Sequence, residues 1–150
     1  MKRGYNAAMK IDITPLEKAL GQLDESLQVL DSRPWGDDEK LKRSFERGAI
    51  QAFGVTYNVA MNLLRRQMEQ EAADPGQLRA MDIENRFRLA ADAGLIPDAE
   101  RFFDYRKKRE LTAQSYLDEV VQKLIAILDP FRHDIRFLLE ALRKRGELAA

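Results

Sequence analysis

The stretch TPLEKALGQLDESLQVL, residues 14–30, decides the fold class. Thr14 and Glu17 are spaced as in a capping box, and Pro15 suits the first position of a helix. The sequence therefore predicts a helix that begins at Thr14. Its leucines recur at alternating spacings of four and three, which is an apolar stripe of heptad type: Leu16, Leu20, Leu23, Leu27 and Leu30.

The last long segment repeats this pattern without a slip in phase. Its apolar residues are Leu117, Val121, Leu124, Leu128, Phe131, Ile135, Leu138 and Leu142. Pro130 interrupts the hydrogen-bond ladder of a helix but leaves the apolar phase intact. We therefore expect one kinked helix, while Asp129 and Pro130 could also be the cap and first residue of a separate helix.

A second helix is predicted between these two segments, capped by Asp37 or Asp38 and reaching about Glu71. Its predicted inward face is Leu41, Phe45, Ala49, Phe53, Tyr57, Ala60, Leu64 and Met68. Gly48 and Gly54 lie inside it, and each costs about 1 kcal/mol relative to alanine in a helix interior. Close approach of another helix or a ligand site at the backbone would explain them.

Two further helices complete the pattern. The segment 72–77 breaks the periodicity; a third helix fits Leu78 to Ala93, with Gly94 as its C-terminal stop. A fourth begins at Pro97 with acidic residues in its first turn. The fold class is thus all-α, an antiparallel up-and-down bundle of four to five helices. We expect one domain over residues 1–150, with a core from about 14 to 142 and tails at 1–12 and 146–150.

Composition narrows the function. The 150 residues include 25 basic and 25 acidic side chains, one histidine and no cysteine, so disulfide scaffolds and thiolate metal sites are excluded. His133 alone cannot supply a zinc ligand set, and no metal or cofactor is predicted. No apolar run is long enough for a signal peptide or membrane span, so we expect a cytoplasmic protein. The zero net charge means that any nucleic-acid site must arise from local clustering.

Such a cluster lies at residues 106–109. Four consecutive cations precede small polar residues, and Ser115 with Asp118 and Glu119 resembles the start of another helix. Cations beside the free N–H groups of a helix N-terminus form an anion site, so the predicted phosphate-binding residues are Arg106, Lys107, Lys108, Arg109 and Ser115. The alternative is that the four cations form the solvated last turn of a helix.

Whether Arg109, Gln114 and Tyr116 share a site depends on where that helix ends. In a continuous helix Arg109 and Tyr116 would lie on one face, with Gln114 about 140° away from Arg109. A break near Thr112 to Ser115 would let all three converge. The spacing alone leaves both arrangements open.

Two blocks resemble a known family. They are FERGAIQAFGVTY at residues 45–57, and AGLI at 93–96 followed by RELTAQSY at 109–116. In this order they resemble the HEPN superfamily, in the branch of nucleotidyltransferase substrate-binding, or HepT-like, proteins. The likeness runs from about Thr14 to Leu142.

The resemblance implies a helical bundle that forms a homodimer and partners a minimal nucleotidyltransferase. In HepT toxins an arginine and a histidine form an RNA-cleaving site at the dimer interface, and a nearby tyrosine is nucleotidylated by the partner, which silences the toxin. The arginine corresponds to Arg109 and the tyrosine to Tyr116, whereas Gln114 stands at the histidine position. Acidic residues common in the first block are replaced by Gly54 and Asn58.

The differences from the family motif determine the functional hypotheses. RNA hydrolysis needs proton transfer, which histidine supplies and Gln114 does not. Glu110, at the position of a common asparagine, could act as a base only if burial raised its pKa. The leading hypothesis is a HepT-like subunit with weak or no ribonuclease activity. It would bind a nucleotidyltransferase, and could also bind the phosphate of a nucleotide or RNA. The alternatives are an active, metal-independent endoribonuclease toxin and a non-enzymatic dimeric scaffold.

Overall fold

Six helices make up the part of the chain, residues 11–112 and 118–149, that this computed structural model describes. No strand occurs in these residues, so the predicted all-α class is confirmed. None of these helices combines the length and apolar character needed to cross a membrane. In chain order they are α2 (Thr14–Ser32), α3 (Glu39–Glu71), α4 (Pro75–Ala80), α5 (Ile83–Asp92), α6 (Ala99–Thr112) and α7 (Asp118–Ala149).

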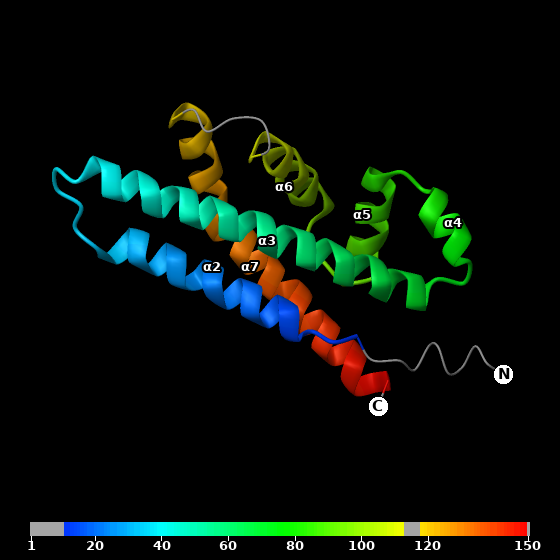
Figure 1. The fold of residues 1–150 in the computed structure, drawn as a ribbon. Helices are drawn as coiled ribbons and strands as arrows, with labels where there is room; N and C mark the ends of the chain where they lie inside the picture. The colour runs from blue at the N-terminus through cyan, green and yellow to red at the C-terminus, as the bar shows by residue number, and fades with distance from the viewer. Residues whose placement is uncertain (1–10, 113–117, 150) are drawn as a thin grey trace.

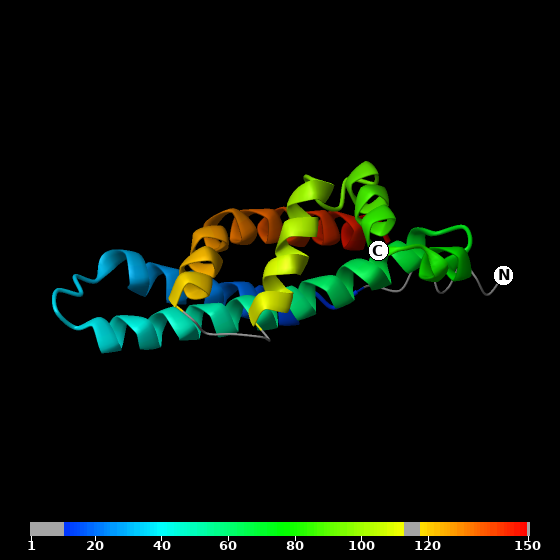
Figure 2. The ribbon, with the colours of Figure 1, turned by 90° about the horizontal axis from the view of Figure 1, so that it is seen from above.

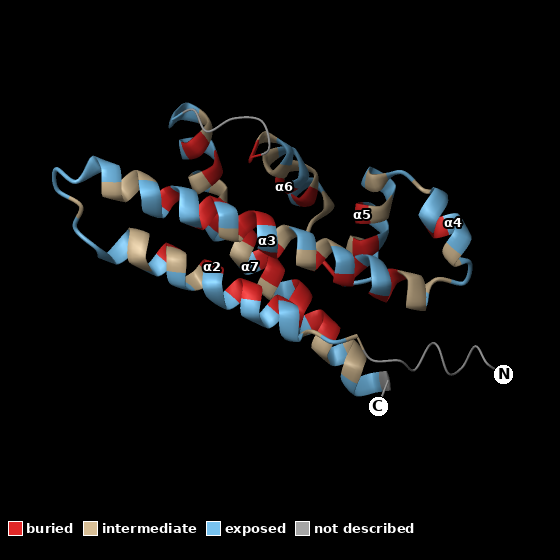
Figure 3. Cartoon of the chain, in the orientation of Figure 1, coloured by how far each residue is buried: buried red, intermediate tan, exposed pale blue. Residues whose placement is uncertain are grey.

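The three long helices form the body of the bundle. Helices α2 and α3 run antiparallel and side by side, and α7 packs across both of them, while α6 and α5 cover the remaining side (Figures 1 and 2). The buried residues gather where α2, α3 and α7 face one another (Figure 3). The heptad stripes of α2 and α7 therefore pack within the core of the chain itself. Buried residues of these stripes include Leu16, Leu23, Leu128, Ile135 and Leu138.

The start of α2 differs from the predicted capping box. Ile13 is the N-cap, in a helical conformation, and makes no side-chain cap bond. The Thr14 N–H donates to Asp12 Oδ1 at 3.0 Å, and Glu17 instead forms an ion pair with Arg143 of α7. The capping box was wrong because Asp12 takes the local acceptor role and Glu17 has a tertiary partner.

Helix α3 confirms most of its prediction. Asp38 caps it by accepting the Leu41 N–H at 3.3 Å, and the helix ends at Glu71. Phe45 was wrongly placed on the inward face: it is 37% exposed and packs against Trp35, with ring centroids 5.3 Å apart. The neighbouring Glu46 is buried instead and accepts a hydrogen bond from Gln122 of α7.

The predicted third helix is two helices, which raises the number within the described chain to six. Asp82 interrupts it by accepting the Asn85 N–H at 2.8 Å, which makes it the N-cap of α5. Asp74 caps α4 in the same way, inside the segment that was predicted to be a break. Gly94 follows α5 with φ of 79°, in the left-handed region that glycine favours, as expected for a helix stop.

Helices α6 and α7 are joined by a buried polar cluster. Asp134 of α7 is 6% exposed and accepts hydrogen bonds from Arg101 at 2.7 and 3.0 Å and from the Tyr105 hydroxyl at 2.6 Å. Helix α7 continues through Pro130, so the single-helix prediction is confirmed. It changes direction within its first half (Figure 2). Helix α6 starts at Ala99, two residues after the predicted Pro97.

Candidate phosphate-binding site

Arg109 lies in the last turn of α6 and extends its side chain to α3. Its Nη1 donates to Thr112 Oγ1 at 2.6 Å, and its Nε lies 3.5 Å from Asn58 Oδ1. The Thr112 hydroxyl in turn donates to the Arg109 carbonyl oxygen at 2.6 Å. Thr112 is buried, so this pair of bonds fixes the guanidinium at the junction of the two helices. Nη2 makes no hydrogen bond to a described residue.

Gly54 provides the space for this guanidinium. A Cβ added at Gly54 would lie 3.3 Å from Arg109 Cζ, which is tighter than ordinary van der Waals contact, and 3.5 Å from Nε, which is within it. Gly48, by contrast, would meet nothing within 4 Å. The sequence suggested that Gly54 allows either the close approach of another helix or a ligand site at the backbone. Neither describes it fully, since the group that approaches Gly54 is a cationic side chain.

The neutral character of these α3 neighbours determines the charge of the site. The two positions where the family resemblance places acidic residues, Gly54 and Asn58, both lie against Arg109. No ion pair formed between described residues includes Arg109. Its positive charge is thus oriented by uncharged oxygen atoms and remains available to an anion.

The other predicted phosphate ligands on α6 are partly engaged. Arg106 pairs with Glu110 at 3.9 Å, and Lys108 pairs with Asp104 at 2.8 Å, each one helical turn apart. Lys107 is exposed and forms no ion pair with any residue that the structure describes. The four cations therefore lie within a helix that continues to Thr112, and Arg109 is the one that reaches α3.

Tyr57 lies half-buried on α3, close to the same cations. Burial raises the pKa of its hydroxyl, while the positive charges of Arg106 and Arg109 oppose that increase. Glu110 acts in the same direction as burial. Glu110 is itself exposed, with 57% of its side chain accessible, so the burial required for a base at this position is absent.

The remaining motif residues, Gln114, Ser115 and Tyr116, lie outside the residues that the structure describes. Among the described residues, helix α6 extends to Thr112 and α7 starts at Asp118. His133 is not buried as a catalytic base would be. Its side chain is 60% exposed, and Nε2 lies 3.7 Å from Asp129 Oδ2. This agrees with its interpretation as an exposed helix residue.

Comparison with known proteins decides the family. The model of the family described as "nucleotidyltransferase substrate binding protein like" matches residues 11–144. The chain belongs to this family. Its sequence is 29% identical over 140 residues to a Haemophilus influenzae protein named "Probable ribonuclease HepT", covering 92% of this chain and 96% of the relative.

The fold of this family member also matches a solved structure. A Haemophilus influenzae protein, described as showing the fold of a substrate-binding domain of a nucleotidyltransferase, superposes with a TM-score of 0.82 at 28% identity. The match covers 88% of this chain and 99% of that one. The resemblance drawn from the two sequence blocks is thereby confirmed for the family and for the fold.

Two residues of the site had no role in the sequence interpretation. The sequence pattern marks Thr112 only as a possible helix end and Tyr57 only as an apolar residue of α3. Thr112 follows Arg109 by three residues, a spacing that places two side chains on one helix face, so the contact could have been anticipated. The position of Tyr57 near the cations depends on how α6 packs on α3, which no local spacing reveals.

Proposed function

We propose that this family member is the partner subunit of a minimal nucleotidyltransferase and that it holds a nucleotide or RNA phosphate on Arg109. Ribonuclease activity is weak or absent because Gln114 stands at the position of the motif histidine. Tyr116 is the acceptor for nucleotidylation, and Arg106, Lys107, Lys108 and Ser115 add to the phosphate-binding surface.

The observation that carries this proposal is the environment of Arg109. Its guanidinium is fixed by Thr112 and Asn58, lies over Gly54, and has no carboxylate partner among the described residues. A fixed arginine with an unused N–H edge donates well to a phosphate oxygen, because such charge-assisted bonds are about twice as strong as neutral ones. An acid at position 54 or 58 would compete with that phosphate.

The same site lacks the motif histidine that would transfer protons. Cleavage of RNA through its 2′-hydroxyl needs a base at that hydroxyl and an acid at the leaving oxygen, and Gln114 can only hydrogen-bond. Loss of one acid–base group costs about 10²- to 10⁴-fold in rate. Arg109 would still stabilise developing negative charge, so phosphate binding persists while cleavage is reduced.

The partner proposal rests on the family and on the chemistry of Tyr116. In nucleotidylation, the tyrosine oxygen attacks the α-phosphorus of a nucleoside triphosphate. A new O–P bond forms, the bond to the β-phosphate breaks, pyrophosphate leaves, and the phenolic proton is released. The nucleotidyltransferase supplies the triphosphate and its activation, while this chain supplies the acceptor.

We also propose a homodimer. The heptad stripes of α2 and α7 cannot form its interface, since nearly all of their described residues are buried within the chain. A surface near the site remains available: Val55, next to Gly54 on α3, is 48% exposed. Sedimentation velocity at tens of micromolar is expected to show a dimer, and a monomer at that concentration would contradict this part of the proposal.

The binding proposal is tested with a short, fluorescently labelled single-stranded RNA at low salt. Fluorescence anisotropy is expected to show that Arg109→Gln weakens binding at least tenfold. Arg66→Gln, an exposed arginine elsewhere on α3, provides a matched control that should change the affinity less than twofold. Equal losses in the two variants would show general charge attraction and overturn the Arg109 site. Absence of RNA, phosphate and nucleotidyltransferase binding would favour the scaffold alternative.

A further inference from the structure

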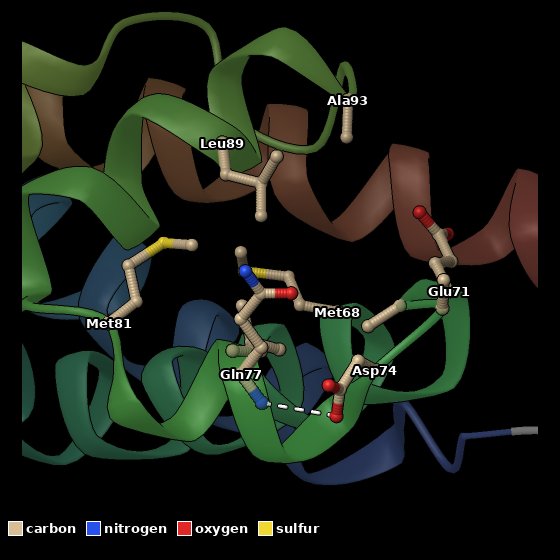
Figure 4. A pocket seen from close by; sticks show the side chains of 10 residues that line it. Met68, Glu71, Asp74, Gln77, Met81, Leu89 and Ala93 are labelled. Carbon is tan, nitrogen blue, oxygen red and sulfur yellow. Dashed lines mark hydrogen bonds between the residues drawn. The ribbon is translucent and has the colours of Figure 1, made fainter.

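Two hollows flank α4, and they differ in charge. The first has a volume of about 350 Å³ and lies between α3, α4 and α5. Figure 4 shows Met68, Met81 and Leu89 pointing into it, with the carboxylates of Glu71 and Asp74 near its edge. Its walls are apolar and its charged groups are acidic, so nothing in it attracts an anion.

The second hollow, of about 340 Å³, also lies against α3, α4 and α5 but is lined by a different set of side chains. Its apolar walls include Met61 and Leu64 from α3, and Ile83 and Phe87 from α5. Tyr57 lines it as well. This volume lies within the range of small-molecule sites, which extends from about 300 to 1,000 Å³.

Basic residues outnumber acidic ones around this second hollow. Arg65, Arg79 and Arg86 line it, and Glu69 is the one carboxylate among its described lining residues. Glu69 is shared by two of these cations, at 3.5 Å from Arg65 and 3.8 Å from Arg79. The lining therefore carries an excess of positive charge.

Arg86 is the cation left without a partner in the described chain. Its Nε is buried and has no hydrogen bond, and no ion pair between described residues includes it. A buried donor without a partner is unfavourable, and for a charged group the penalty is larger. Arg86 also lines the hollow, so an anion bound there would pair with the charge of its guanidinium.

We propose that this hollow binds a small organic anion with a flat apolar body. The acid group contacts Arg86, and the apolar body lies among Met61, Leu64 and Phe87. Arg65 and Arg79 add long-range attraction to the acid. Arg109 does not line this hollow, although Tyr57 lies near both, and binding here does not require the function proposed above.

The ligand class is tested with two matched pairs of probes, 2-naphthoate against 2-naphthol and adenosine monophosphate against adenosine. Isothermal titration calorimetry is carried out with the Arg109→Gln variant, in which binding to the other site is weakened. At least one anion is expected to bind one-to-one and at least tenfold more tightly than its neutral twin. The tighter of the two anions shows whether the acid is a carboxylate or a phosphate monoester.

Two substitutions locate the binding. Arg86→Gln is expected to weaken anion binding at least tenfold, whereas Arg88→Gln is expected to change it less than twofold. Arg88 lies on the same helix, exposed, with its guanidinium 5.2 Å from the ring centre of Phe103, so it controls for the loss of charge. Met61→Trp fills the hollow without changing its charge and should also weaken binding, which keeps the test informative if Arg86→Gln does not fold.

Three results would overturn the proposal. They are no saturable binding of either anion up to 1 mM, equal affinity for the anionic and neutral member of each pair, and an equal loss of affinity in Arg86→Gln and Arg88→Gln. Circular dichroism and thermal unfolding of each variant distinguish a change in binding from a loss of structure.

Discussion

The guanidinium of Arg109 lies directly against Gly54, and a Cβ on that glycine would stand 3.3 Å from Arg109 Cζ. Glycine in a helix interior is unfavourable by about 1 kcal/mol relative to alanine. Here it opens a place on α3 for a cation from α6. Asn58, one turn further along α3, presents a neutral oxygen to the same guanidinium.

Gly54→Ala is expected to increase stability while weakening RNA binding. The alanine raises helix propensity by up to about 1 kcal/mol, and its Cβ meets the Arg109 guanidinium, which must shift by a few tenths of an ångström from the position set by Thr112 and Asn58. Because this movement displaces the phosphate-binding group, the RNA affinity should fall severalfold. Urea denaturation and fluorescence anisotropy measure the two effects.

Gly48→Ala provides the matched control for this experiment. Its added Cβ would meet nothing within 4 Å, so the helix should be stabilised without any change in RNA affinity. Equal effects of the two alanines on RNA binding would contradict a specific role for the contact between Gly54 and Arg109.

Asn58→Asp is expected to weaken RNA binding at least fivefold at low salt. The new carboxylate would lie near Arg109 Nε, where the amide oxygen is now 3.5 Å away, and would compete with phosphate for the guanidinium. Asn62→Asp adds the same charge one turn away, next to Arg65. Asn62→Asp should weaken RNA binding less than Asn58→Asp. Equal losses would mean that the added carboxylate repels RNA in general and does not act through Arg109.

Tyr116→Phe is expected to abolish nucleotidylation. The chain is mixed with its partner nucleotidyltransferase, ATP and magnesium, and its intact mass is measured. One nucleotidyl group should be added to the unmodified sequence and to Tyr57→Phe, which removes a half-buried hydroxyl near the cations. An adduct that persists in Tyr116→Phe would place the acceptor elsewhere.

Stability is expected to fall at alkaline pH through Tyr105. Burial, followed by its hydrogen bond to Asp134, raises the pKa of this hydroxyl well above the usual value of 10.0. The unfolded chain therefore loses the phenolic proton first, so the stabilisation is complete below about pH 10 and decreases as the pH rises further.

Tyr105→Phe isolates this effect from the titration of lysines. It removes the 2.6 Å bond to Asp134 and should lower the free energy of unfolding by about 1–2 kcal/mol at pH 7. The difference between the two proteins should then shrink as the pH rises from 10 to 11 in urea denaturation. If the difference in free energy of unfolding stayed constant between pH 10 and 11, the pKa of the Tyr105 hydroxyl would be the same in the folded and unfolded chain.

The long helices could be predicted from sequence because their apolar periodicity directly reflects burial. The stripes of α2 and α7 face the core as expected, and the continuity of phase across Pro130 correctly indicated one helix. The failures occurred where a polar side chain redirected the backbone. Asp82 followed by Asn85 was a capping signal within the predicted third helix, and the apolar spacing obscured it.

The burial errors have a tertiary origin. Phe45 fits the period of the α3 core face, yet it packs against Trp35 from the connecting segment, while Glu46 is buried because Gln122 of α7 meets it. The candidate site shows the same division. The sequence identified Arg109, Gly54 and Asn58 separately, but their contact depends on the packing of α6 against α3, which no local pattern specifies.

The most direct test of the account compares RNA cleavage by the unmodified chain with cleavage by Gln114→His. The histidine would restore the proton-transfer group of the family motif, so the cleavage rate of a bound RNA should rise about 10²- to 10⁴-fold, with little change in RNA affinity. This gain should disappear in the double variant Gln114→His with Arg109→Ala. Rapid cleavage by the unmodified chain that Arg109→Ala abolishes and Gln114→His does not increase would contradict the account and identify the protein as an active ribonuclease.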